Sequence, residues 1–146
     1  DAYAEAKGEA MTCREIYGKH GAGYFRALEQ SVLKNIVSET PGVIALGGGS
    51  LMETEKPEEL LKGSLCVYIS VEREALFNRI MSGGMPSFFD PQIPRDSFEE
   101  LCRQRLPLYG RLADVTTDNT DRPAEEVAGE IAAALRKTVM TDGGHR

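Results

Sequence analysis

Hydrophobic residues repeat at helical spacing in the first third of the chain. Over residues 23–39, one helical face carries the apolar side chains Phe25, Leu28, Val32, Leu33 and Ile36. A shorter helix is predicted before it, because Thr12 and Glu15 have the spacing of a capping box and Gly21 allows a left-handed residue at a helix end. The pattern therefore predicts two successive helices that meet near Gly21.

Short apolar runs rich in β-branched residues predict three strands, over 43–46, 65–71 and 114–118. Helices are predicted between and after them, and the one that ends at Leu112 begins with the capping-box pair Ser97 and Glu100. The predicted helices cover 57–62, 72–81, 97–112 and 123–137, and the tail 138–146 is predicted to be disordered. Strands that alternate with helices are typical of an α/β fold with a parallel sheet, as in doubly wound proteins.

Three consecutive glycines, Gly47, Gly48 and Gly49, follow the first predicted strand directly. Ligands of parallel sheets bind at the carboxyl ends of the strands, where glycine lets the backbone approach a ligand closely. The glycines therefore predict the floor of a binding site. A tight strand-to-helix turn explains the same residues equally well.

Residues 82–95 match no regular element, because they contain two glycines and three prolines: Gly83, Gly84, Pro86, Pro91 and Pro94. Loops of about this length are usually functional lids or disordered segments. We therefore predict a lid loop over 82–95.

Composition is that of an ordinary globular domain, with 146 residues, 41% hydrophobic and 27% charged. A net charge of −6 without a basic stripe disfavours a nucleic-acid partner, and no apolar run is long enough to span a membrane. The three cysteines are widely spaced, which predicts neither a disulfide framework nor a zinc site and fits a reducing cytoplasm. A small anionic ligand would need a few converging arginines.

Four segments together resemble the shikimate kinases, which are small P-loop kinases. These segments are 21–29 around Phe25-Arg26, 43–49 with its three glycines, Arg105-Leu106-Pro107-Leu108-Tyr109 followed by Ala113-Asp114, and Asp121-Arg122-Pro123. The resemblance covers residues 1 to about 135. It implies a three-layer α/β fold of the nucleoside-monophosphate-kinase type. It also implies a monomer that phosphorylates shikimate to shikimate 3-phosphate in aromatic amino acid biosynthesis, with ATP and Mg²⁺.

The resemblance also implies roles for individual residues. Arg26 and Arg105 resemble the pair that clamps the shikimate carboxylate, a task suited to the planar fork of guanidinium. Gly47, Gly48 and Gly49 resemble the loop whose amides line the acceptor pocket, and Asp1 resembles the carboxylate that orients or deprotonates the acceptor hydroxyl. Arg79 and Pro123 resemble the two positions that sandwich the adenine.

Two features depart from the family pattern. The 146 residues contain no G-x-x-x-x-G-K-[ST] motif to hold the ATP phosphates, so we expect the sheet to lack its first one or two strands, the parent protein to be longer, and this chain alone to be inactive. In addition, Met85 precedes Pro86 where many relatives have an arginine. Arg95 is the nearest cation in the lid loop and is predicted to take the catalytic role of that arginine.

Three alternatives remain open at this point. The first is a related P-loop kinase of another hydroxy acid, such as gluconate. The second is a binding module without catalysis, and the third is an interaction protein whose sheet accepts a strand from a partner.

Overall fold

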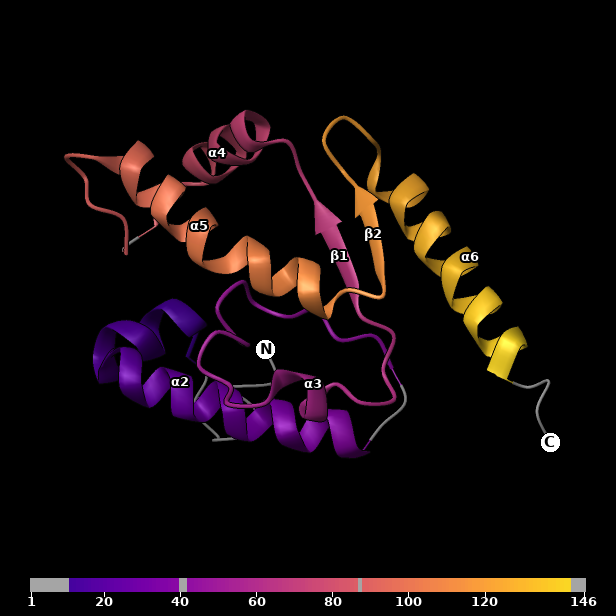
Figure 1. Cartoon of the computed structure of the whole chain (residues 1–146). Helices are drawn as coiled ribbons and strands as arrows, with labels where there is room; N and C mark the ends of the chain where they lie inside the picture. The colour runs from indigo at the N-terminus through magenta and orange to yellow at the C-terminus, as the bar shows by residue number, and fades with distance from the viewer. Residues whose placement is uncertain (1–10, 40–41, 87, 143–146) are drawn as a thin grey trace. The chain divides into compact units, whose positions relative to one another are not determined.

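The computed structural model describes residues 11–39, 42–86 and 88–142 (Figure 1). Two compact units divide the chain, Asp1–Lys62 (unit 1) and Gly63–Arg146 (unit 2), and each is described by itself. From its sequence, the chain is also predicted to form one α/β domain over residues 1–137, and this stays a prediction.

Unit 1 is built on α2 (Cys13–Glu39), which is broken at Gly21 as the sequence predicts. Gly21 has φ 80° and ψ 173°, a backbone conformation that only glycine adopts readily. The predicted capping box is present, because the Thr12 amide donates to Glu15 Oε2 at 2.7 Å and the Glu15 amide donates to Thr12 Oγ1 at 3.3 Å. Local sequence signals therefore fix both the start of α2 and its break.

The small core of unit 1 lies on one face of α2. Ile16, Phe25 and Leu28 are buried together, and the Tyr17 ring meets the Phe25 ring edge to face at 5.7 Å across the Gly21 break. After residues 42–56 the chain forms the single turn α3 (Pro57–Leu60), which begins at a proline, as is common at the first helical position.

The predicted strand over 43–46 is not a strand in the structure. Val43 is fully exposed, and Ile44 and Leu46 are 38% and 40% exposed. A strand is stabilised by the backbone of a neighbouring strand, and none lies among the described residues of unit 1. The apolar run over 43–46 has the composition of a strand, but no neighbouring strand pairs with it among the described residues of unit 1.

Unit 2 contains a two-stranded parallel sheet, β1 (Val67–Ser70) and β2 (Val115–Asp118), with Val67 opposite Val115 and Ser70 opposite Asp118. The helices α4 (Arg73–Ser82), α5 (Pro94–Leu112) and α6 (Ala124–Asp142) flank it, with α6 beside β2 (Figure 1). The predicted α/β class with a parallel sheet is thereby confirmed. The described sheet has two of the three expected strands.

The core of unit 2 holds α4, α5 and the lid loop together. Phe98 is 1% exposed and packs with Phe89 and Cys102, and its ring meets the Phe77 ring of α4 at 5.3 Å. Because Phe89 belongs to the lid loop, this loop is anchored by a buried aromatic side chain rather than held only at its ends.

Two helix boundaries differ from those predicted. α5 begins at Pro94 rather than at Ser97, because proline at a first helical position suits the helix start and the Ser97 hydroxyl instead accepts from the Asp90 amide at 3.0 Å. The lid loop between α4 and α5 therefore covers 83–93. α6 continues to Asp142, so residues 138–142 of the expected tail are helical, and 143–146 lie outside the described residues.

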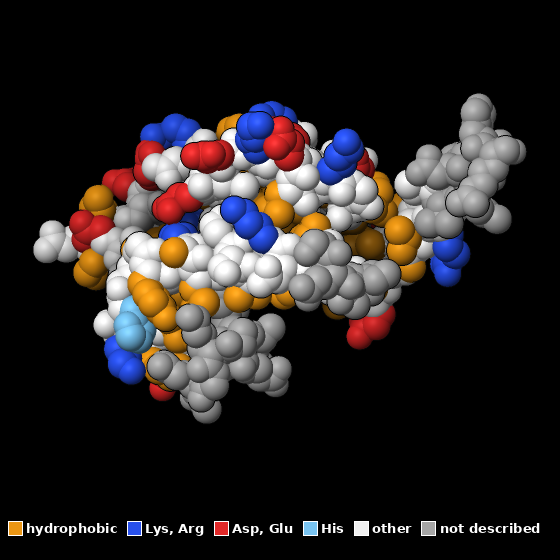
Figure 2. All heavy atoms as spheres, turned by 90° about the horizontal axis from the view of Figure 1, so that it is seen from below, with side chains coloured by type: hydrophobic (Ala, Val, Ile, Leu, Met, Phe, Trp, Pro, Cys, Tyr) orange, Lys and Arg blue, Asp and Glu red, His pale blue; other side chains and the backbone are white. Residues whose placement is uncertain are grey.

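No helix in the described part of the chain is long and apolar enough to cross a membrane. On the face shown in Figure 2, acidic side chains lie beside several of the basic ones.

Candidate functional site

Arg26 is held by a buried carboxylate one helical turn away. Its guanidinium donates from Nη1 to Glu29 Oε2, and the other carboxylate oxygen, Oε1, accepts from Ser50 Oγ at 2.9 Å. Glu29 and Ser50 are each 6% exposed, whereas the Arg26 side chain is 25% exposed. The arginine is thus fixed from the protein side and still reaches solvent.

The three glycines form a turn beside this arginine. We call this turn, together with Ser50, the glycine turn (residues 47–50). The Ser50 amide donates to the Gly47 carbonyl at 3.0 Å, and the Met52 amide donates to the Gly49 carbonyl at 3.1 Å. A Cβ atom added to Gly49 would lie 2.6 to 2.9 Å from three atoms of the Arg26 guanidinium. A side chain at position 49 would force the Arg26 guanidinium to shift, so the structure brings Arg26 and Gly49 together.

Three residues of this arrangement were missed by the sequence reading: Glu29, Ser50 and Gln30. Gln30 Nε2 donates to the Ser50 carbonyl at 2.8 Å and to Thr54 Oγ1 at 2.6 Å, which ties the glycine turn to α2. The available signal was a glutamate three residues after Arg26, the spacing of a helical ion pair. No local signal pointed to Ser50, because its partner is 21 residues away in the chain.

In unit 2, Arg79 reaches the loop that leads to Pro123. From α4 its guanidinium donates to the Asn119 carbonyl at 2.8 Å and also to the Thr120 carbonyl. The structure thus brings the predicted adenine-binding arginine to the segment that precedes the predicted adenine-binding proline. That the two sandwich an adenine ring stays a prediction.

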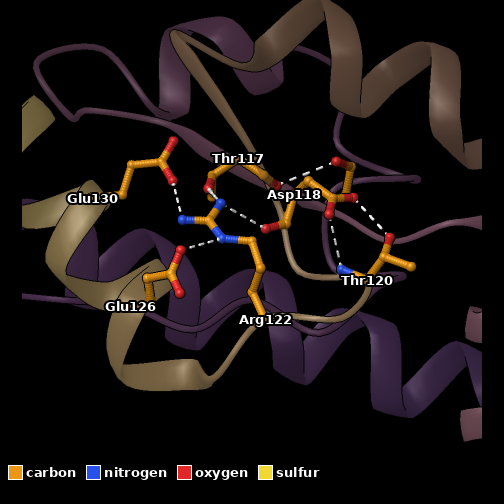
Figure 3. A network of polar contacts seen from close by, with 7 residues as sticks. Thr117, Asp118, Thr120, Arg122, Glu126 and Glu130 are labelled. Atoms are coloured by element: carbon orange, nitrogen blue, oxygen red, sulfur yellow. Dashed lines mark hydrogen bonds and ion pairs between the residues drawn. The ribbon is translucent and has the colours of Figure 1, made fainter.

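A polar network fixes the shape of that segment (Figure 3). Arg122 pairs with Glu126 at 2.9 Å and with Glu130 at 2.7 Å, and it donates to the Asp118 carbonyl at 3.0 Å. The hydrogen bonds that Arg122 donates to Glu130 and Glu126 raise the pKa of Arg122. Hydrogen bonds from the Thr120 hydroxyl and amide lower the pKa of Asp118. The loop after β2 is therefore locked to the start of α6.

Arg105 lies on α5 in unit 2, and Arg26 lies in unit 1, so the clamp of both arginines stays a prediction. The Arg105 guanidinium carbon is 5.9 Å from the centre of the Phe88 ring, within the range of a cation–π contact. Burial raises the pKa of Tyr109, and a hydrogen bond with Arg105 opposes that rise.

Arg95 occupies the first turn of α5 rather than the lid loop. Its guanidinium pairs with Glu74 at 2.7 Å and with Glu99 at 3.4 Å, and it stacks over Phe77 at 4.7 Å. These contacts join α4 to α5. The catalytic role of Arg95 in place of Met85 stays a prediction, and Asp1 lies outside the described residues.

Comparison with known proteins shows the family of this chain. The family profile described as "Shikimate kinase" matches residues 1–136. The chain belongs to the shikimate kinase family. A shikimate kinase of Dehalococcoides mccartyi is 31% identical over 143 residues, which cover 98% of this chain and 80% of that protein. One of Rhizobium meliloti is 30% identical over 125 residues, 86% of this chain and 65% of that protein.

A solved structure has the same fold. The shikimate kinase from Acinetobacter baumannii in complex with shikimate is 25% identical, with a TM-score of 0.79 over 94% of this chain and 75% of that one. The chain spans 65% of the length of the Rhizobium meliloti relative and 66% of that of a Bartonella henselae shikimate kinase.

Proposed function

We propose that this protein transfers the γ-phosphoryl group of ATP to a hydroxyl of shikimate, which is the reaction that its family resemblance implies. The observation that carries the proposal is the contact of Arg26 with Gly49, with Glu29 and Ser50 behind it. A partly exposed arginine that is fixed beside glycine backbone is suited to bind a small carboxylate.

The acid is bound before any chemistry takes place. Glu29 holds the Arg26 guanidinium in one orientation, so little side-chain entropy is lost when a carboxylate binds. We propose that Arg105 supplies the second guanidinium of the clamp. Among the described residues Arg105 has no carboxylate partner, in contrast to Arg26, Arg95 and Arg122.

ATP supplies the phosphoryl group, and its adenine is proposed to lie between Arg79 and Pro123. The two backbone hydrogen bonds of Arg79 hold the plane of its guanidinium, which is the surface that would stack on a purine. Mg²⁺ is expected from the family. The described residues contain no group of three or more His, Cys, Asp or Glu side chains that could hold a metal ion.

The test measures ADP release by the protein expressed from its full reading frame, with shikimate and with gluconate as acceptors. Arg26→Lys and Arg105→Lys should each raise the KM for shikimate about tenfold or more, with little change in the KM for ATP, because a fork of hydrogen bonds is lost while the charge stays. Arg103→Lys is the matched control, since Arg103 lies on the same helix as Arg105 with a side chain 71% exposed.

Each of three other outcomes would favour a different alternative to the proposed function. Turnover of gluconate in preference to shikimate would replace the proposed substrate. Binding of shikimate without ADP release would indicate a non-catalytic binding module. Equal effects of the two lysine variants on both KM values would reject the carboxylate clamp.

A further inference from the structure

The lid loop presents one aromatic side chain to the surface next to an anchored one. Phe89 is 4% exposed in the core of unit 2, and its amide donates to the Pro86 carbonyl at 3.0 Å. Its neighbour Phe88 is 56% exposed, and the two rings meet edge to face at 5.4 Å. The buried anchor therefore fixes where the exposed ring lies.

The Phe88 ring lies against Arg105, the arginine of unit 2 that we assign to the acid. The guanidinium carbon is 5.9 Å from the ring centre. Arg105 also acts on Tyr109, one turn further along α5, where it opposes the rise in the tyrosine pKa that burial causes. Within the described residues, no carboxylate holds Arg105 in place as Glu29 holds Arg26. The aromatic ring and the tyrosine therefore take the place of an ion pair.

We propose that Phe88 is a positioning residue that holds the Arg105 guanidinium for the carboxylate of the substrate, so that the lid loop acts on binding of the acid. The proposal rests on the proposed function, because it assumes that Arg105 binds the acid. An aromatic partner suits this role better than a carboxylate would, because it orders the guanidinium without competing as an anion for its hydrogen-bond donors.

The expected effect is small and specific. An exposed cation–π contact is worth about three- to fivefold in affinity, or about 0.7 to 1 kcal/mol at 1.4 kcal/mol per tenfold. The loss should appear in the binding of shikimate and leave the binding of ATP unchanged, since Arg79 is held by the Asn119 carbonyl and Arg122, next to Pro123, by the Asp118 carbonyl.

The first experiment measures the Kd of shikimate and of ATP by calorimetry, with the protein from its full reading frame. Phe88→Leu should weaken shikimate binding about three- to fivefold, whereas Phe88→Tyr keeps the ring face and should bind as the wild type does. Ile93→Ala is the control, because Ile93 is an apolar side chain of the same loop that is 49% exposed. Equal losses for Phe88→Leu and Phe88→Tyr, or none for either, would overturn the proposal.

A second experiment does not depend on the substrate. The 146 residues contain no tryptophan, so Phe88→Trp introduces a fluorophore at the contact itself. Addition of Arg105→Gln removes the cation and should shift the emission of this variant, and Arg103→Gln should not. Unchanged emission after Arg105→Gln would overturn the contact. If the wild type fails to bind shikimate, the proposed function is wrong, and the fluorescence result still decides whether Phe88 holds Arg105.

Discussion

A methyl group at Gly49 is the most direct test of the site in unit 1. The Cβ atom of Gly49→Ala would lie 2.6 Å from Nη2 of Arg26, where carbon and nitrogen normally keep about 3.5 Å. Gly49 is not among the described glycines with positive φ, so alanine brings no backbone strain there. The substitution therefore acts on one neighbour, the Arg26 guanidinium.

The expected loss of shikimate affinity follows from the hydrogen bond with Glu29 that the Arg26 guanidinium would lose. To restore an ordinary contact it must move by roughly 1 Å, which disturbs its ion pair with Glu29, whose side chain is 8% exposed. Hydrogen bonds to charged groups contribute about 1.5 to 3 kcal/mol. We therefore expect shikimate binding about 10- to 100-fold weaker. The fold should stay intact, because the Arg26 side chain is 25% exposed and can move toward solvent.

The assay is the shikimate Kd together with the thermal unfolding midpoint, measured for three alanine variants. Gly42→Ala is the control, since nothing lies within 4 Å of its added Cβ, and it should bind as the wild type does. Gly47→Ala should be intermediate, because its Cβ would lie 3.1 Å from Ser50 Oγ. A Gly49→Ala protein that folds normally and binds shikimate with wild-type affinity would refute the role of this close approach.

Two further predictions concern stability. Gly21→Ala should destabilise the protein by about 1 to 3 kcal/mol, because φ is 80° there, while Gly23→Ala in the following helical turn should stabilise it by up to about 1 kcal/mol. Urea unfolding measures both, and effects of the same sign would contradict the assigned break in α2. Arg122 lowers the pKa of Glu130 from its ordinary value of 4.5. The stabilisation that the ionised Glu130 carboxylate gives is therefore present above the ordinary pKa. It is lost as the pH falls through the lowered pKa of the folded protein. Glu130→Gln should accordingly flatten the fall of Tm between about pH 5 and about pH 3, and an unchanged slope would show that the pair with Arg122 does not contribute.

Elements whose causes are local could be predicted from the sequence. The capping box of Thr12 and Glu15, the break at Gly21 and the proline that precedes α6 each act within a few residues, and the structure contains all three. The start of α5 was misplaced because two local signals compete there. The proline at 94 prevailed over the serine at 97.

Features that depend on distant partners could not be predicted in the same way. The run over 43–46 has the composition of a strand, but a strand also needs a neighbour, which sequence periodicity does not supply. Glu29 is buried because Ser50 and Arg26 surround its two carboxylate oxygens, and Ser50 is brought there by the fold. The sequence could indicate the arginine and the glycines of the site, but not the carboxylate that joins them.

The contact between Arg79 and the loop before Pro123 follows from topology. Ser70 ends β1 opposite Asp118, which ends β2, and parallel strands place both ends at the same edge of the sheet. The Asn119 amide donates to the Ser70 carbonyl at 2.8 Å across this edge. The helix after β1 therefore starts beside the loop after β2, and an arginine two turns into α4 can bind the carbonyls of that loop. Because ligands of such sheets bind outside the carboxyl ends of the strands, this edge is where the adenine is expected.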